Sequence, residues 1–117
     1  MIGGARLAAV GLLLAALGGC TSTGGLGTPV PTAAVELPPS YRFAPADIAV
    51  PAGTTVTWSN RDNFTHSVQF VDGDLPANPL TMEPGQSVEL TFAAPGVYQY
   101  ECHLHPRDMT GSVTVTP

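Results

Sequence analysis

A strand that runs into a ligand-rich loop is the most informative stretch of this sequence. It reads Gly96-Val97-Tyr98-Gln99-Tyr100-Glu101-Cys102-His103-Leu104-His105-Pro106-Arg107-Asp108-Met109. Tyr98, Tyr100 and Cys102 alternate with other side chains at a period of two, which is the pattern of a half-buried β-strand. After Cys102 the alternation stops, and two histidines and a methionine follow. The stretch therefore predicts a strand that delivers a cysteine to one end of a sheet.

The same alternation recurs along most of the chain. The apolar pairs and triplets are Val35 and Leu37, Tyr41 and Phe43, Ile48 and Val50, Val56 and Trp58, Val68 and Phe70, Val88, Leu90 and Phe92, and Val113 and Val115. Proline (12 residues) and glycine (13 residues) punctuate the chain, at Pro51-Ala52-Gly53, Asp72-Gly73-Asp74, Glu83-Pro84-Gly85 and Pro95-Gly96 among others. About seven short strands at roughly ten-residue spacing predict an all-β domain, an antiparallel sandwich or barrel. Residues 75–82 contain two prolines and are expected to form a loop.

The N-terminal segment is typical of a secretory signal. Residues 7–17 are uninterrupted Leu, Ala, Val and Gly after a single Arg6, and this run is shorter than the roughly 20 residues of a spanning helix. The following Leu17-Gly18-Gly19-Cys20 resembles the lipobox of bacterial lipoproteins. That resemblance implies cleavage before Cys20 and its lipidation. An ordinary signal peptide with a chance cysteine is the alternative.

These features divide the chain into three parts. Residues 1–19 are expected to be a signal peptide, residues 20–32 a lipidated N-terminus and flexible tether rich in Thr, Ser, Gly and Pro, and residues 33–117 one folded domain. The expected location is outside the cytoplasmic membrane, lipid-anchored on the periplasmic or cell-surface side.

Composition excludes some classes of partner. The formal net charge is −5, and all four cations are arginines. Removing residues 1–19 also removes Arg6, so the charge of the remainder is about −6. Nucleic-acid binding requires clustered cations, and so does electrostatic docking on anionic lipid. Neither partner is expected.

The small number of cysteines suggests that Cys102 is a metal ligand or a catalytic thiol. Cys20 and Cys102 are the two cysteines of the chain. If Cys20 is lipidated, Cys102 is a lone thiol in an oxidising compartment, where thiols tend to be paired, bound to metal or catalytic.

Four side chains form a candidate ligand set: His66 at the start of a predicted strand, and Cys102, His105 and Met109 around the loop described above. Two imidazoles, a thiolate and a weak thioether favour copper. Structural zinc sites prefer four strong donors, and iron–sulfur clusters require more cysteines. Taken singly, each of these residues is commonly a turn histidine or a core side chain.

The motifs that resemble a known family are Phe43-Ala44-Pro45, Ile48-Ala49-Val50, the run from Gly53 to Asp62, His66-Ser67-Val68 and the run from Gly96 to Cys102. Their order and spacing resemble the cupredoxins, of the plastocyanin and amicyanin type, over about residues 35–115. The resemblance implies a Greek-key β-sandwich with one mononuclear copper that transfers single electrons and is not an enzyme. It also implies that His66 and His105 bind copper through nitrogen, Cys102 through its thiolate, and Met109 weakly and axially.

Two positions depart from the family pattern. Three residues separate His105 from Met109, whereas amicyanin-like loops have two and plastocyanin-like loops four, so the axial bond of Met109 is in question. His103 directly follows Cys102, where many relatives have a small neutral residue. Alternation sends His103 to the opposite face, so an exposed histidine is expected, with a weaker metal contact or a proton-linked modulator as alternatives.

By the same resemblance, His105 is the electron gateway, and redox partner proteins dock near it. Carboxylates including Asp62, Glu101 and Asp108 either steer a basic partner or only keep the domain soluble. A monomer is expected.

Other functions fit the sequence less well. Copper storage or delivery at the cell surface generally uses Met-rich or His-rich tracts, and this chain has three methionines and three histidines. Copper enzymes need additional histidine clusters. A metal-free interaction domain leaves the ligand set unexplained.

Overall fold

The computed structural model describes residues 28–71, 75–76 and 78–117. The expected signal peptide, Cys20, most of the expected tether and the Asp72-Gly73-Asp74 turn lie outside these residues. Within the described ranges, no helix is long and apolar enough to cross a membrane.

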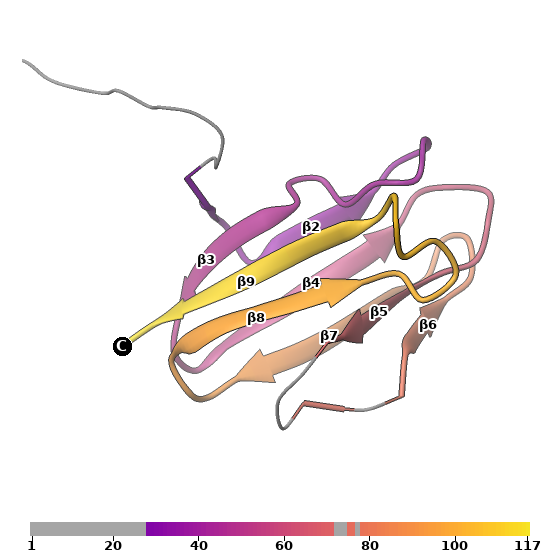
Figure 1. Cartoon of the computed structure of the whole chain (residues 1–117). Helices are drawn as coiled ribbons and strands as arrows, with labels where there is room; N and C mark the ends of the chain where they lie inside the picture. Colours follow the sequence, from indigo (N-terminus) through magenta and orange to yellow (C-terminus); the bar gives the residue numbers. More distant parts are fainter. Residues whose placement is uncertain (1–27, 72–74, 77) are drawn as a thin grey trace, which may run out of the picture.

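The described residues form nine strands in two sheets (Figure 1). The strands are β1 (Val30–Pro31), β2 (Ala34–Leu37), β3 (Asp47–Pro51), β4 (Thr54–Asn60), β5 (His66–Phe70), β6 (Leu80–Met82), β7 (Ser87–Phe92), β8 (Gly96–Glu101) and β9 (Thr110–Thr116). The larger sheet has the order β1-β3-β9-β8-β5-β6, and the smaller has the order β2-β4-β7. The predicted all-β sandwich is confirmed.

The sheets are mixed rather than wholly antiparallel. β1 with β3, β2 with β4, and β3 with β9 pair in parallel. The other neighbours, including β4 with β7 and β8 with β9, are antiparallel. Parallel neighbours need a crossover connection, and here the connection passes through strands of the opposite sheet, as β2 does between β1 and β3. Alternation within one strand does not reveal this connectivity.

Three local expectations were wrong. Residues 75–82 were expected to be a loop, but Leu80–Met82 form β6 and pair with β5. The segment holding Tyr41 and Phe43 is irregular rather than a strand, and it makes one isolated bridge at Ala44. Val30 pairs with β3 inside the expected tether, so the sheet begins before residue 33.

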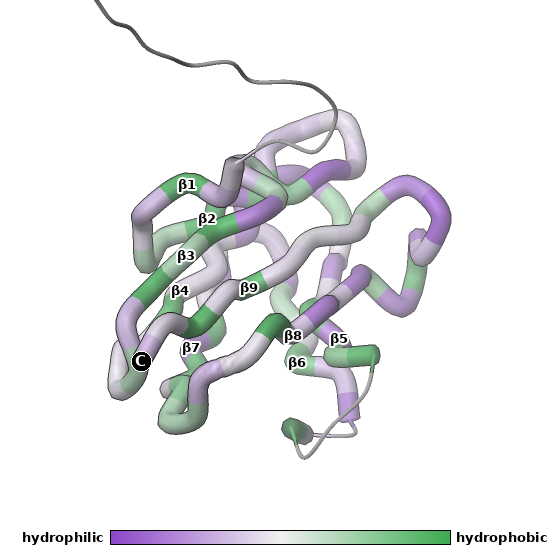
Figure 2. The backbone as a smooth tube through the Cα atoms, turned by 60° about the vertical axis from the view of Figure 1, so that its left-hand side comes forward, coloured by the Kyte–Doolittle hydropathy of each residue, from purple (hydrophilic) through white to green (hydrophobic). Residues whose placement is uncertain are grey.

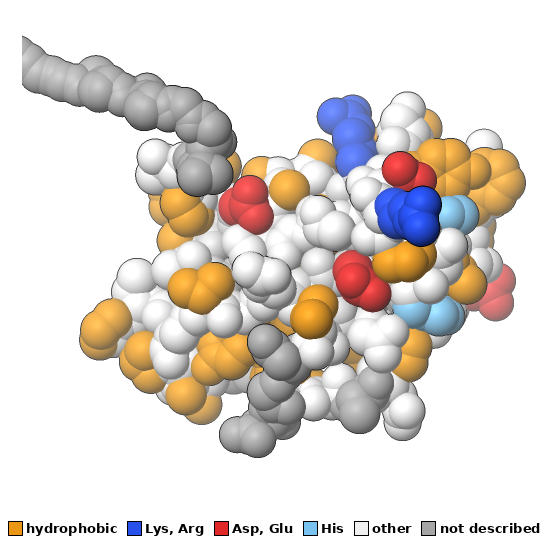
Figure 3. Space-filling model, viewed as in Figure 1, with side chains coloured by type: hydrophobic (Ala, Val, Ile, Leu, Met, Phe, Trp, Pro, Cys, Tyr) orange, Lys and Arg blue, Asp and Glu red, His pale blue; other side chains and the backbone are white. Residues whose placement is uncertain are grey.

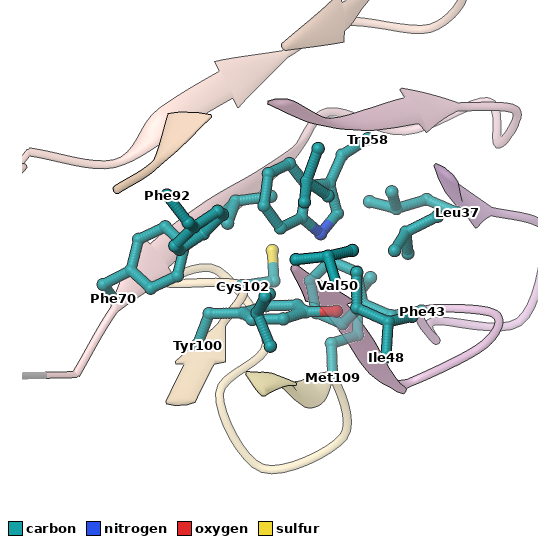
Figure 4. Close-up of a cluster of buried hydrophobic side chains, with 14 of the residues drawn as sticks. Leu37, Phe43, Ile48, Val50, Trp58, Phe70, Phe92, Tyr100, Cys102 and Met109 are labelled. Atoms are coloured by element: carbon teal, nitrogen blue, oxygen red, sulfur yellow. The ribbon is translucent and has the colours of Figure 1, made fainter. Parts of the chain in front are cut away.

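The core lies between the two sheets. Its largest fully buried side chains are aromatic and aliphatic, with Trp58, Tyr100 and Phe92 at its centre. In Figure 2, hydrophobic residues recur along the strands. Figure 4 shows Cys102 and Met109 within the same buried cluster as Trp58 and Tyr100. Two of the predicted ligands therefore belong to the hydrophobic core, where the surrounding packing fixes their positions.

The loops that precede or carry the predicted ligands meet at one end of the sandwich. Figure 1 shows the β2–β3, β4–β5 and β8–β9 connections together at the right-hand end. Residues far apart in the sequence are brought together there.

Candidate metal centre

His66 is the first residue of β5, and the loop before it is organised by Asn60. The Asn60 side chain accepts a hydrogen bond from the backbone N–H of Asp62 (2.9 Å). Its amide donates to the carbonyl oxygens of Phe64 (2.8 Å) and Met82 (3.0 Å). Asn60 is buried, so these bonds also satisfy its own polar atoms. The loop consequently enters β5 along a defined path.

The imidazole of His66 is fully buried and oriented by Asp62. Nε2 of His66 lies 2.8 Å from Oδ2 of Asp62. The hydrogen bond from His66 is the main reason that the pKa of Asp62 is lowered, and desolvation opposes it. A carboxylate at Nε2 places the proton on that nitrogen, which leaves the lone pair of Nδ1 free for a metal. Asp62 is buried, so its carboxylate contacts His66 rather than lying on the surface.

Cys102 follows the last residue of β8 and directs its sulfur to His66. Nδ1 of His66 lies 3.9 Å from Sγ of Cys102. Bonds of about 2.0 Å to nitrogen and 2.3 Å to sulfur, at a trigonal angle of about 120°, would place two ligand atoms about 3.7 Å apart. The backbone N–H of Ser67 also donates to Sγ, at 3.4 Å. The pair therefore fits two ligands of one metal ion, with a donor that stabilises negative charge on the sulfur.

The β8–β9 loop is folded into tight turns. The N–H of His105 donates to the carbonyl of Cys102 (3.0 Å), and the carbonyl of His105 accepts from Asp108 (3.1 Å) and Met109 (3.0 Å). The N–H of Cys102 in turn donates to the carbonyl of Met109 (3.1 Å). The three-residue gap is thus absorbed in a turn, and the Met109 side chain is fully buried.

His105 lies beside His66 but is only partly buried. The two imidazole centroids are 5.6 Å apart. In the described part of the chain, no group of three or more His, Cys, Asp or Glu side chains closes around one common point. The donors are close in pairs, with His66 next to both Cys102 and His105.

His103 is exposed, as expected, but its ring is not free. Nδ1 lies 2.6 Å from Oγ of Ser67, and the backbone N–H of His103 donates to the same oxygen (3.1 Å). The Ser67 hydroxyl also lies 3.8 Å from Sγ of Cys102. The direction of the bond between Oγ of Ser67 and Nδ1 of His103 depends on the tautomer of His103, and Sγ of Cys102 is the other acceptor within reach of the hydroxyl.

The surface around the site combines exposed apolar side chains with charged side chains of both signs. Tyr41, Phe64 and Leu104 are exposed hydrophobic residues of this end. All described cations lie in its loops, namely Arg42, Arg61 and Arg107, and Arg61 pairs with Glu36 at 2.9 Å. Figure 3 shows hydrophobic, cationic and acidic side chains gathered around the histidines at the right-hand end.

Sequence reasoning missed three residues of this region. Asn60 and Ser67 are ordinary polar residues in a strand pattern, and only their contacts reveal their roles. Tyr41 was assigned to a strand, although its ring lies against His105. The adjacent Pro38-Pro39 was a signal that the chain leaves the sheet there.

Comparison with known proteins agrees with this geometry. A family model described as copper-binding proteins of the plastocyanin/azurin family matches residues 38–116. Chloroplastic plastocyanin of Physcomitrium patens is 37% identical in an alignment of length 84 that covers 63% of this chain and 50% of that protein. Amicyanin of Paracoccus denitrificans is 39% identical over 77 residues, 63% of this chain and 58% of the relative. The chain thus spans about half the length of these two relatives.

Solved structures give the same assignment. A purple cupredoxin from Nitrosopumilus maritimus has a TM-score of 0.64 and 32% identity, over 73% of this chain and 100% of the other. A reduced amicyanin variant has a TM-score of 0.63 and 36% identity, over 70% and 79% of the two chains. The chain is therefore a cupredoxin, a member of the plastocyanin/azurin family of copper-binding proteins, and its implied cofactor is one copper ion.

Proposed function

We propose that this chain is a single-electron carrier whose copper is held by His66, Cys102, His105 and Met109. The observation that carries the proposal is the buried pair of His66 Nδ1 and Cys102 Sγ, 3.9 Å apart. Membership of the cupredoxins supports the role, because that family generally carries single electrons at a type 1 copper site.

The bound ion would supply the chemistry by cycling between Cu(I) and Cu(II). The protein's contribution is to keep its donors in one arrangement for both states. Asp62 fixes the ring of His66, the turns of the β8–β9 loop fix Cys102 and Met109, and the N–H of Ser67 donates to the sulfur. Such fixed hydrogen bonds to the ligands tune the reduction potential of a metal site.

Electrons would enter and leave at His105, the partly exposed imidazole. Exposed apolar side chains surround it, Tyr41, Phe64 and Leu104, and apolar patches of this kind mark protein interaction sites. Redox partner proteins are proposed to dock there. A lipid anchor at Cys20 would hold the domain outside the cytoplasmic membrane.

The deciding test is the visible and EPR spectrum of the full-length chain after addition of Cu(II). An intense blue band with narrow copper hyperfine splitting is expected, and Cys102→Ser should abolish it. A green species would keep the ligand set but indicate a stronger bond to Met109.

A colourless protein with ordinary Cu(II) EPR would contradict ligation by Cys102. Copper trafficking or a metal-free role would then be the better interpretation. Met109→Leu separates the axial role: the colour should persist and the reduction potential should rise. An unchanged potential would remove Met109 from the ligand set.

A further inference from the structure

The two predicted histidine ligands are held in different ways. His66 is fully buried and has a carboxylate at Nε2, 2.8 Å away. The ring of His105 is partly exposed and has no side-chain hydrogen bond to any described residue. Among the described residues, the His105 ring therefore lacks the kind of hydrogen bond that orients His66.

The ring of Tyr41 packs against the His105 ring instead. Its centroid lies 4.6 Å from that of His105, with an interplanar angle of 66°. It also meets the ring of His66 edge-on, at 6.0 Å and 89°. Tyr41 is thus in contact with both imidazoles, and edge-to-face geometry of this kind is attractive between aromatic rings.

Phe64 supports Tyr41 from the neighbouring loop. The two rings are stacked, with centroids 6.0 Å apart and an interplanar angle of 20°. Tyr41 is 38% exposed and Phe64 is 55% exposed, so the pair is not part of the core. The Tyr41 hydroxyl has no hydrogen-bond partner among the described residues, which leaves the ring itself as the part that makes the contacts.

The backbone that carries Tyr41 is held in an unusual conformation. Ser40 has a φ of 97° and Tyr41 a φ of 53°, values that non-glycine residues rarely adopt. The excursion is closed by two hydrogen bonds between Glu36 and Ala44, at 2.9 and 2.8 Å. Two consecutive left-handed residues persist only where the surroundings over-determine them, and such strain concentrates at functional sites.

We propose that Tyr41 is a positioning residue for the copper ligand His105, braced by Phe64. Its ring holds the imidazole in one orientation before and after copper binds. The inference rests on the proposed function for the identity of His105 as a ligand. The orienting contact itself belongs to the metal-free protein and is measurable there.

The test compares Tyr41→Ala, Tyr41→Phe and Phe64→Ala in the full-length chain. Tyr98→Ala is the matched control, because Tyr98 is a partly buried tyrosine that packs on Phe92 and donates to the Ala94 carbonyl, away from the ligands. In the copper-free protein, the ring signals of His105 in NMR should be single and sharp in the parent and in Tyr41→Phe. They should broaden or split in Tyr41→Ala.

In the copper-loaded protein, release of Cu(I) to a chelator should be about two- to tenfold faster in Tyr41→Ala. Phe64→Ala should show a smaller change in the same direction, and its exposed position keeps the test valid if Tyr41→Ala fails to fold. Parent-like His105 signals and parent-like release in the alanine variants would overturn the proposal. Failure of the proposed function is distinguishable, since it would appear as the absence of a blue copper band with the His105 ring signals still responsive to Tyr41→Ala.

Discussion

At the scale of single residues, the proposed copper site depends on hydrogen bonds that neighbouring side chains make to its ligands. Asp62→Ala should lower copper affinity about 10- to 100-fold, because the His66 ring loses the partner that fixes its orientation and tautomer. Asp62→Asn keeps a hydrogen-bond acceptor but not the charge, so its copper affinity should lie between those of the parent and of Asp62→Ala. Competition with a copper chelator measures the affinity. Glu36→Gln is the control, because Glu36 is an exposed carboxylate that pairs with Arg61. Unchanged affinity in Asp62→Ala would show that the buried carboxylate is not needed to orient the ring.

His103 acts on the same site through Ser67. His103→Leu should raise the reduction potential, because without the imidazole at 2.6 Å the Ser67 hydroxyl is left with Sγ of Cys102, 3.8 Å away, as its acceptor. A hydrogen bond to the thiolate weakens its donation to the metal and favours Cu(I). Voltammetry of the variant gives the answer, and the double variant with Ser67→Ala should lose the increase. A potential that falls or stays constant would show that loss of the imidazole does not strengthen the bond from the hydroxyl to the sulfur.

At the scale of elements, the pairing of β8 with β9 positions the ligand loop. Gly111 lies opposite Tyr100 in this pair. A Cβ at Gly111 would lie 2.6 Å from Cζ and Oη of Tyr100 and would also collide with the carbonyl oxygen of Ala46. Burial raises the pKa of the Tyr100 phenol above its usual range, and the protonated hydroxyl donates to that carbonyl at 3.1 Å. Glycine is therefore required at residue 111 by close packing.

Gly111→Ala should accordingly reduce the free energy of unfolding by about 1–3 kcal/mol, the usual cost of overpacking. Urea unfolding of the copper-free protein measures it. The same substitution in a Tyr100→Leu background should cost less, since the shorter side chain removes the clash with the ring and leaves only the one with the Ala46 carbonyl oxygen. Equal costs in the two backgrounds would mean that the ring is not the obstacle.

At the scale of the whole molecule, the proposed copper site would join segments that lie far apart in the sequence. His66 opens β5, whereas Cys102 and Met109 flank the β8–β9 loop. A ligand that binds only the folded state stabilises it by mass action, by about 4 kcal/mol at a concentration 1,000 times its Kd. Removing copper with a chelator should therefore lower the Tm in calorimetry. In Cys102→Ser, addition and removal of copper should shift the Tm far less, and an equal shift would place the stabilising ion elsewhere.

The sequence alone determined much of the strand layout, and it supplied the donor set that we propose for copper. Alternation at Val56 and Trp58, or at Tyr98 and Tyr100, is local, because a strand with one buried face needs it wherever the strand pairs. The choice of two imidazoles, a thiolate and a thioether is likewise a property of residue types, and it pointed to copper and to the cupredoxins before any geometry.

The tertiary structure decided the features that arise from contacts between segments far apart in the sequence. The parallel pairing of β3 with β9 and the short strand β6 arise from partners that no local pattern names. Asp62 was expected at the surface and is buried on His66, and Tyr41 was expected in a strand and lies on His105. The physical reason is that burial and hydrogen bonding of a loop residue are set by the loops packed against it, and periodicity carries no information about those neighbours.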